Sequence, residues 1–363
     1  METSYTVPTP VLLGSRRTQS KPVRARTRFD LTRADLEDLL GGEPHFRVDQ
    51  VWHGLIEQGR ELEDLTTLPK ALRTKLASEP LLATALRLTA ESASTDGTTK
   101  WLWALQDGAQ IETVLMHYPG RSTVCISSQA GCAMACGFCA TGQAGFTRHL
   151  SVGEIVEQVA RARVRATVDG RRLSNVVFMG MGEPMANYGP VWDAVHRLHH
   201  EFGLSARHLT ISTVGLVPGI RRMAAEALPV NLAVSLHAAD DDKRNEMVPI
   251  NRTYPLAELA DACASYIAAK NRRLSFEWAM IDGVNDTKGD SRQLAAYARP
   301  LGAHVNLIPL NATPGYQTVG TSPARVRAFR DELIELGINA TVRQNRGTNI
   351  DAACGQLAAR HGK

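Results

Sequence analysis

The stretch SQAGCAMACGFCATG, residues 128–142, places three cysteines at the spacing C-x3-C-x2-C. A structural zinc ion takes four protein ligands, and Cys125 could join Cys132, Cys136 and Cys139 as the fourth. Zinc sites usually pair C-x2-C units, however, and this run is atypical of them. A four-iron cluster held by three thiolates leaves one iron free to bind an exogenous chelate. The spacing therefore favours an iron–sulfur cluster, with zinc as the alternative.

Around this loop the sequence alternates between apolar strand patterns and helical patterns. Strand patterns cover 122–128, 174–180, 208–213, 230–237, 274–281 and 304–310, and helical patterns cover 151–164, 255–270 and 322–337. This alternation predicts an α/β fold with a parallel sheet and helices outside it. Sites in such folds form at the carboxyl ends of the strands. The cysteine loop, Gly182-Glu183-Pro184 and Asn311 all follow strand patterns, so we expect them to share one site.

Charge and pattern divide the chain into five segments. Residues 1–28 carry six basic residues and one acidic residue without periodicity, which predicts a disordered basic tail. The rest of the chain holds 35 basic and 36 acidic residues, so its overall charge gives no strong nucleic-acid signal, and RNA contact there must come from local patches. We predict the tail at 1–28, a helical accessory domain that docks RNA at 29–95, a connecting β-hairpin at 96–121, the core at 122–345 and a C-terminal loop at 346–363.

The apolar residues show no membrane or secretion signal. No run of 18 apolar residues exists, and the first residues lack the apolar region of a secretory signal. We therefore expect a cytoplasmic protein without a membrane partner. Thiols stay reduced in that compartment, so its six cysteines favour metal binding or catalysis over structural disulfides.

The cysteine spacing, Phe138 before the last cysteine and the Gly-Glu-Pro tripeptide together resemble the radical S-adenosylmethionine (SAM) superfamily. Further stretches are similar to the methyltransferases that modify adenine carbon 2 in 23S ribosomal RNA and in transfer RNA. They are QAGFTRHL, FMGMGEPMANY, STVGLVPGI, AVSLHAADDDKRNEMVPINR, DGVNDT, NLIPLN and GTNIDAACGQLA. The similarity spans about residues 30–360. It implies a partial (β/α)6 barrel with a small N-terminal helical accessory domain.

The resemblance also implies the chemistry. A 4Fe-4S cluster on Cys132, Cys136 and Cys139 would bind SAM, and one electron would release a 5′-deoxyadenosyl radical. Two SAM molecules would be used per turnover, one as methyl donor and one as radical source. The targets would be an adenine in the peptidyl-transferase region of 23S ribosomal RNA and an adenine beside the anticodon of transfer RNA. A flavodoxin or ferredoxin system would donate electrons, and we assume a monomer.

Three residues match the catalytic residues of that family. Cys354 aligns with the methyl carrier that becomes S-methylcysteine, and Cys125 with the thiol that forms a transient disulfide with it. Glu112 matches the proton acceptor, although Cys125 remains a rival for that role. A lone cysteine is more often a buried small hydrophobe. Cys263 shows that pattern, since it shares a helical stripe with Leu259, and we assign it to core packing.

The same resemblance predicts the SAM and RNA contacts. The SAM pocket would contain Gly182, Glu183, Ser212, Ser235, Leu236, His237 and Asn311. Arg343 and Arg346 precede the Cys354 loop and are our candidates for RNA contact, because the planar guanidinium suits phosphate. The other arginine pairs are expected to be ordinary solvated surface.

Two other functions compete with this one. A sister group that methylates carbon 8 of adenine and confers antibiotic resistance shares the cysteine plan. A zinc-stabilised RNA-binding protein without enzymatic activity is the alternative from another class, but it leaves Cys354 and the Gly-Glu-Pro loop without a role.

Overall fold

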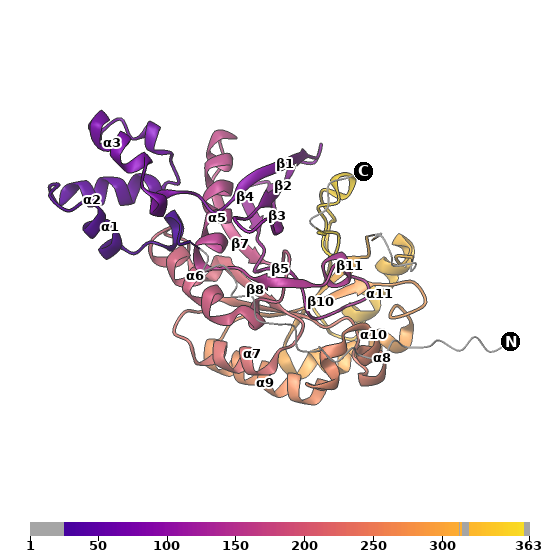
Figure 1. Cartoon of the computed structure of the whole chain (residues 1–363). Coiled ribbons are helices and arrows are strands. Elements are labelled where there is room, and N and C mark those ends of the chain that lie inside the picture. The colour runs from indigo at the N-terminus through magenta and orange to yellow at the C-terminus, as the bar shows by residue number, and fades with distance from the viewer. Residues whose placement is uncertain (1–24, 312, 314–318, 359–363) are drawn as a thin grey trace, which may run out of the picture.

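The computed structural model describes residues 25–311, 313 and 319–358, and its centre is one sheet of ten strands (Figure 1). The first four strands pair antiparallel, whereas β4 and the six strands beyond it are parallel. In sheet order the strands are β1 (Arg87–Ala93), β2 (Thr98–Ala104), β3 (Gln110–Tyr118), β4 (Arg121–Cys125), β7 (Leu173–Phe178), β8 (Leu209–Thr213), β9 (Asn231–Ser235), β10 (Leu274–Met280), β11 (His304–Pro309) and β12 (Ala340–Val342). A separate hairpin joins β5 (Gln129–Gly131) to β6 (Phe146–His149).

The parallel part confirms the predicted α/β class. All six predicted strand segments form strands, namely β4 and β7 to β11. The sheet also contains β12, whose three residues are too few to show a pattern. From β4 to β12 the spatial order follows the sequence order, so each helical crossover adds its strand on the same side. Within the described ranges the edge strands β1 and β12 do not pair, which makes the barrel an open, partial one.

Helices cover the outer face of the parallel strands (Figure 1). Helix α5 begins with the predicted capping box, in which Ser151 and Glu154 bond each other's backbone N–H groups. In the core and its loops the helices are α4 (Ala140–Gln143), α5 (Val152–Val168), α6 (Tyr188–His200), α7 (Val217–Ala225), α8 (Asp241–Met247), α9 (Leu256–Lys270), α10 (Lys288–Ala298) and α11 (Pro323–Glu335). No described helix is long and apolar enough to cross a membrane.

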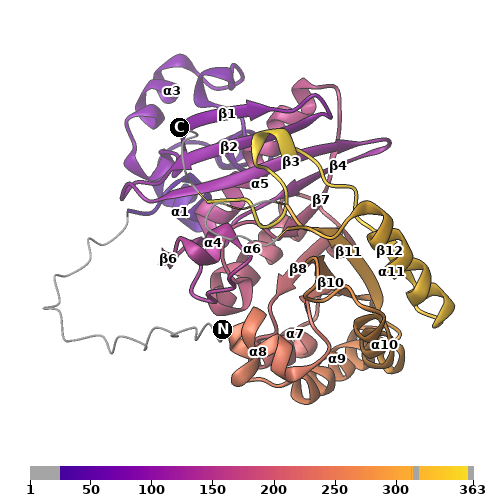
Figure 2. The ribbon, with the colours of Figure 1, turned by 90° about the vertical axis from the view of Figure 1, so that its right-hand side faces the viewer.

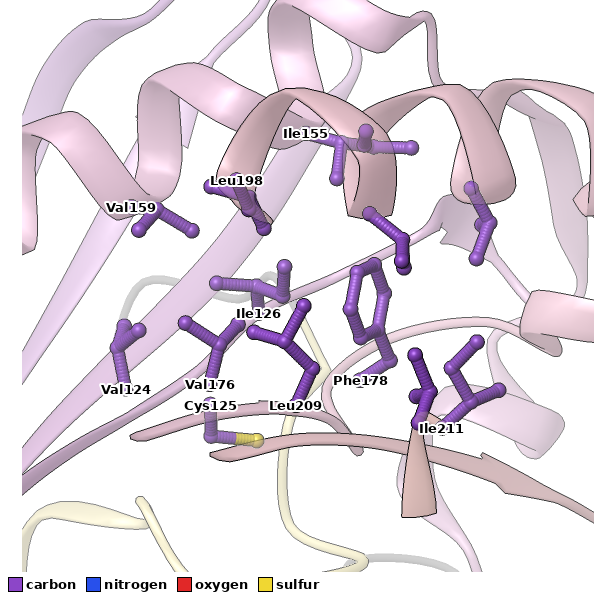
Figure 3. Close-up of a cluster of buried hydrophobic side chains, with 14 of the residues drawn as sticks. Val124, Cys125, Ile126, Ile155, Val159, Val176, Phe178, Leu198, Leu209 and Ile211 are labelled. Carbon is purple, nitrogen blue, oxygen red and sulfur yellow. The ribbon is translucent and has the colours of Figure 1, made fainter. Parts of the chain in front are cut away.

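An apolar layer joins the sheet to helices α5 and α6 (Figure 3). The side chains in this layer that Figure 3 labels are at most 1% exposed; they are Val124, Ile126, Ile155, Val159, Val176, Phe178, Leu198, Leu209 and Ile211. Burying each such side chain stabilises the fold by about 1.5–3 kcal/mol. Because successive strand residues point to opposite faces, Cys125 points away from this layer and into the barrel (Figure 3).

The N-terminal module contains α1 (Arg33–Leu39), α2 (Phe46–Val51) and α3 (Lys70–Ala77). The prediction of a disordered tail is wrong for its last residues, because Arg28 is buried and forms a 2.9 Å ion pair with Glu61. Residues 1–24 of that predicted tail lie outside the described residues. The prediction of a helical segment up to residue 95 is also wrong at its end, because Arg87–Ala93 forms β1. Pairing with β2 decides this strand, and its local sequence does not show it.

The predicted turn at Asp107-Gly108 joins β2 to β3, and Gly108 adopts the positive φ of +82° that such a turn uses. This hairpin is not a separate connector, however. Its strand β3 pairs with β4, and β4 pairs with β7, so the hairpin extends the barrel sheet. Residues of β3 therefore reach the same interior as residues of the parallel strands.

Candidate active site

A cavity of about 150 Å³ lies at the carboxyl ends of the parallel strands. The cysteine loop lines it with all three predicted ligands, Cys132, Cys136 and Cys139. Residues of β7 to β11 and of the loops that follow them form its walls. The segment of residues 343–358, called here the C-terminal segment, contributes Arg343, Cys354, Gly355 and Leu357. Figure 2 shows this segment, in yellow, crossing in front of β2 and β3. The cysteine loop and Cys354, which are more than 200 residues apart in the sequence, therefore line the same cavity.

Backbone hydrogen bonds shape the cysteine loop. The Cys132 N–H donates to the Gly145 carbonyl at 2.8 Å, and the Cys139 N–H donates to the Cys136 carbonyl at 3.2 Å. Burial raises the pKa of the Cys132 thiol to about 12 and also raises the pKa of Cys136. Without a metal, the Cys132 and Cys136 thiols stay protonated at neutral pH, and a bound metal would supply the positive charge that favours thiolates.

The three thiols fit a cluster better than a single ion. In the part of the chain that the structure describes, no three or more His, Cys, Asp or Glu side chains are arranged to hold one metal ion. Zinc needs its thiolates at about 2.3 Å from one centre. Thiolates that each bind a different iron of a cluster do not have to meet at one point. The donor set therefore suits an iron–sulfur cluster in this cavity.

Glu183 presents a fixed carboxylate to the cavity. Its two oxygens accept hydrogen bonds from the Met185 and Val214 N–H groups, both at 2.9 Å. Burial raises the pKa of Glu183 to about 7, although these hydrogen bonds pull the pKa down. Before it, Gly182 has φ +100°, and a side chain there would collide with Gln129, so only glycine fits. The carboxylate is well placed to receive an ammonium group.

His237 is a neutral hydrogen-bond donor in the wall of the cavity. Its Nδ1 accepts from the Ala279 N–H at 3.0 Å, which assigns the ring proton to Nε2. Burial, together with the nearby Arg244 charge, lowers the pKa of His237 to about 3. The edge of Phe138 packs against the ring at 4.7 Å between centroids. His237 therefore offers an N–H group rather than a charge.

The structure brings together five of the seven residues predicted to contact SAM. These five line the cavity: Gly182, Glu183, Ser212, Ser235 and His237. Leu236 does not line it, because it points into the apolar core and its N–H donates to the Glu277 carbonyl. Asn311 is turned toward the C-terminal segment, where its Nδ2 donates to the Cys354 carbonyl at 3.4 Å. A SAM contact by these two residues stays a prediction.

A second cavity, of about 20 Å³, adjoins the first. Cys125 lines the second cavity, whereas Cys354, Arg343, Met179 and Leu357 line both. Neither Cys125 nor Cys354 forms a disulfide in this structure. Cys354 thus borders the cavity of the cluster cysteines on one side and the cavity of Cys125 on the other.

Glu112 lies on the same sheet face as Cys125 but lines neither cavity. Val114 pairs with Cys125 across the strands, and Glu112 is two residues from Val114 on β3. The Glu112 carboxylate is 3.1 Å from the Lys100 ammonium and accepts from the Ala358 N–H at 3.1 Å. It anchors the end of the C-terminal segment in this structure, and its role as proton acceptor stays a prediction.

The two arginines predicted to contact RNA differ in their surroundings. Arg346 donates to the Asp96 and His117 carbonyls at 2.7 and 2.9 Å and lies over the Tyr118 ring. Arg343 is turned into the two cavities. Contact of these two arginines with RNA stays a prediction.

Two buried charges at the site were missed from the sequence. Glu277 lines the first cavity from the middle of β10, and a carboxylate inside an apolar parallel strand is the signal that could have revealed it. Arg244 sits in the run DDDKR, which looks like a solvated surface, yet it is fully buried. Its guanidinium donates to the Val214 and Leu236 carbonyls at 2.6 and 3.0 Å. It therefore ties together the loops that follow β8 and β9.

Comparison with known proteins gives one consistent answer. The family described as the Radical SAM superfamily matches residues 126–294. The "Probable dual-specificity RNA methyltransferase RlmN" of Chloroflexus aurantiacus is 48% identical over 353 residues, 93% of each chain. The "Dual-specificity RNA methyltransferase RlmN" of Anaeromyxobacter sp. strain Fw109-5 is 46% identical and covers 94% of this chain and 93% of its own.

A solved structure supports the same assignment. The crystal structure of a radical SAM methyltransferase from Sphaerobacter thermophilus superposes with a TM-score of 0.88 at 48% identity, covering 93% of this chain and 100% of that one. The resemblance stated from the motifs is thereby confirmed, and with it the fold and the enzyme class. This chain belongs to the family of dual-specificity RNA methyltransferases in the radical SAM superfamily.

Proposed function

We propose that this enzyme methylates carbon 2 of one adenine in 23S ribosomal RNA and of an adenine beside the anticodon in transfer RNAs, through an S-methylcysteine at Cys354. The observation that carries the proposal is the position of Cys354, which lines the cavity of the cluster cysteines and the cavity of Cys125. A sulfur there can meet a cofactor on one side and a second thiol on the other.

The residues of the first cavity match the groups that the two cofactors present. Cys132, Cys136 and Cys139 would hold the 4Fe-4S cluster. Glu183 would accept a hydrogen bond from the amine of SAM, while hydroxyl and N–H groups of Ser212, Ser235 and His237 would face its ribose and adenine. When bound, the cluster and SAM supply the methyl group and the one-electron cleavage of a carbon–sulfur bond.

The chemistry of adenine explains why a cysteine is needed. Carbon 2 of adenine is not a nucleophile, so it cannot take a methyl group from a sulfonium directly. The Cys354 sulfur is a nucleophile and can take that methyl group from a first SAM. After a second SAM has been used to activate the carried methyl group and the carbon has been joined to adenine, Glu112 would accept the carbon-2 proton. The adduct would also return the one electron that was spent on the second SAM. Cys125 would then form a disulfide with Cys354 while the bond between the Cys354 sulfur and the new carbon breaks, and that carbon would take up the proton that Cys125 loses.

The substrate base has to leave its stack before it can reach this interior. Enzymes that do chemistry on a base extrude it into a pocket or act on unpaired nucleotides. Both the cavity and Cys354 lie inside the barrel, so we expect an unstacked adenine to enter. The reaction then takes place in the cytoplasm, where ribosomal and transfer RNA are available, with a flavodoxin or ferredoxin system as electron donor. A monomer remains our prediction.

The test uses the full chain, reconstituted without oxygen from iron and sulfide. It is incubated with SAM, a reductant and unmodified 23S or transfer RNA, and the nucleosides and the Cys354 peptide are analysed by mass spectrometry. We expect 2-methyladenosine in the RNA and one added methyl group on Cys354. Formation of 8-methyladenosine would assign the sister activity instead. A colourless, zinc-containing protein that methylates neither RNA nor Cys354 would contradict the proposal.

A further inference from the structure

Arg343 is fixed between the two cysteines of the site. It follows β12, and its N–H donates to the Leu307 carbonyl of β11 at 2.8 Å, which sets its backbone at the carboxyl end of the sheet. Its side chain lines both cavities, as Cys354 does, and the second cavity also contains Cys125. The guanidinium therefore shares its surroundings with both sulfurs.

This guanidinium has no fixed partner. Within residues 25–311, 313 and 319–358, no hydrogen bond from the Arg343 side chain and no ion pair within 4.0 Å is found. Arg346, three residues later, shows the contrast, because backbone carbonyls hold its guanidinium. Arg343 is half-buried, and a cation without a partner in such a cavity indicates an anion that is present at another stage of the reaction.

The charged and titratable groups around Arg343 identify that anion. They are Cys354, Glu277 from β10, Cys125 from β4 and Tyr118 from β3. The Glu277 carboxylate already accepts hydrogen bonds from Asn306 at 2.7 Å and Ser275 at 2.8 Å. Farther along the β3 face, the Glu112 carboxylate is paired with Lys100. Burial keeps the Cys125 thiol protonated, so Cys354 is the sulfur whose charge during methyl transfer Arg343 would meet.

The electrostatics agree with this placement. A negative charge on Cys354 is the largest of the influences that raise the pKa of the Arg343 guanidinium. Burial raises the pKa of the Cys125 thiol to about 12 and the neighbouring Cys354 raises it further, while Arg343 lowers it.

We propose that Arg343 is a positioning residue that holds Cys354 as a thiolate for methyl transfer. The inference rests on the proposed role of Cys354 as methyl carrier. In that step the thiol first gives its proton to solvent. The thiolate then forms a bond to the methyl carbon while the sulfonium carbon–sulfur bond breaks, and that electron pair stays on the cofactor sulfur. Arg343 neutralises the charge before the step and loses that attraction afterwards, because S-methylcysteine is neutral.

The test measures thiolate reactivity directly. Full-length, cluster-reconstituted protein without SAM is treated with iodoacetamide at pH 7.5, and alkylation of the unmethylated Cys354 peptide is followed by mass spectrometry. Iodoacetamide reacts with thiolates, so the rate reports the thiolate at Cys354. We expect Arg343→Met to slow alkylation about tenfold and Arg343→Lys to restore most of the rate, since the lysine keeps the positive charge in the shared cavities. Arg330→Met removes the same charge from an arginine that pairs with Asp331 on helix α11 and is expected to leave the rate unchanged.

Two further readouts separate the possible failures. Single-turnover methylation of Cys354 by SAM should slow by a similar factor in Arg343→Met, while its RNA affinity stays at the wild-type value. Unchanged alkylation would overturn the proposal, and unchanged alkylation with weakened RNA binding would assign Arg343 to RNA contact. If wild-type Cys354 never gains a methyl group, the proposed function fails, whereas the alkylation comparison still decides the role of Arg343. Near-ultraviolet circular dichroism checks folding, and Arg343→Gln replaces the Met variant if that one does not fold.

Discussion

Cys125 and Cys263 occupy two regions that are equally buried but chemically different. Burial raises the pKa of both thiols to about 12, and each has an arginine nearby. Cys263 lies on α9 within the apolar core, and its neighbour Arg244 is held by carbonyl groups. Cys125 borders a cavity that contains a second sulfur and the unpartnered Arg343. Burial alone therefore does not separate the two cysteines, whereas a cavity shared with a second thiol does.

Replacing Cys354 is expected to have the largest effect on RNA methylation. If Cys354 carries the methyl group, Cys354→Ala should reduce RNA methylation more than a thousandfold, because among the described residues Cys354 is the cysteine that lines both cavities. The measurement is the methylated adenine formed per enzyme with the reconstituted protein. Iron content and folding serve as controls and should match the wild type. Residual methylation within tenfold of the wild type would remove Cys354 from its role.

Replacing Glu112 is expected to have the next largest effect on the rate of methylation. If its carboxylate accepts the carbon-2 proton, Glu112→Gln should slow turnover about 10²–10⁴-fold, since the amide cannot take the proton. Glu91→Gln is the matched control, because Glu91 also lies on the antiparallel part of the sheet but pairs with Arg165 away from the cavities. Single-turnover rates of both variants decide the question. A Glu112→Gln rate within threefold of the wild type would favour Cys125 as the base.

The low pKa of His237 makes the free energy of unfolding depend on pH. Its pKa is about 3 in the folded chain against an ordinary value of 6.5, so the unfolded chain binds a proton first as the pH falls. The folded state therefore loses stability below pH 6.5, and between pH 7 and pH 5 the loss is about 2 kcal/mol. His237→Gln lacks this contribution and can still accept the Ala279 hydrogen bond. Denaturant unfolding of both proteins without cofactors should show their difference in free energy changing by that amount, and a constant difference would contradict a neutral His237.

The smallest effect is expected in the core region of the comparison. Cys263→Ala should lower the free energy of unfolding by about 1 kcal/mol, because it removes one buried atom, and should leave methylation within twofold of the wild type. Cys125→Ala should cost a similar free energy and yet abolish multiple turnover. Unfolding curves and methylation assays on the two variants form a matched pair. Equal activity of both would erase the distinction drawn between the two regions.

The sequence predicted the parallel barrel well because short apolar-rich strand patterns alternate with helical patterns, and α5 begins with a capping box. It predicted Arg87–Ala93 wrongly, since that strand depends on pairing with β2 rather than on its own residues. Local pattern also missed Arg28, whose burial depends on Glu61 and the Leu82 carbonyl, both more than 30 residues away.

The residues of the site also divide into those that a local sequence signal revealed and those that it did not. Cysteine spacing and the Gly-Glu-Pro tripeptide are local signals, and the cavity contains both. Arg244 and Glu277 were missed because charge in a sequence is read as exposure, whereas here carbonyl groups and neighbouring polar side chains compensate for burial. The approach of Cys354 to both cavities depends on a segment more than 200 residues from the cluster loop, which spacing cannot reveal.

The path of the methyl carbon tests the central claim most directly. Enzyme whose Cys354 carries a ¹³C-labelled methyl group would be mixed with unlabelled SAM, reductant and unmodified RNA, and the first turnover analysed by mass spectrometry. The account predicts that the labelled carbon leaves Cys354 and appears on carbon 2 of the target adenine. Unlabelled methyl groups in the RNA, with the label still on Cys354, would contradict it.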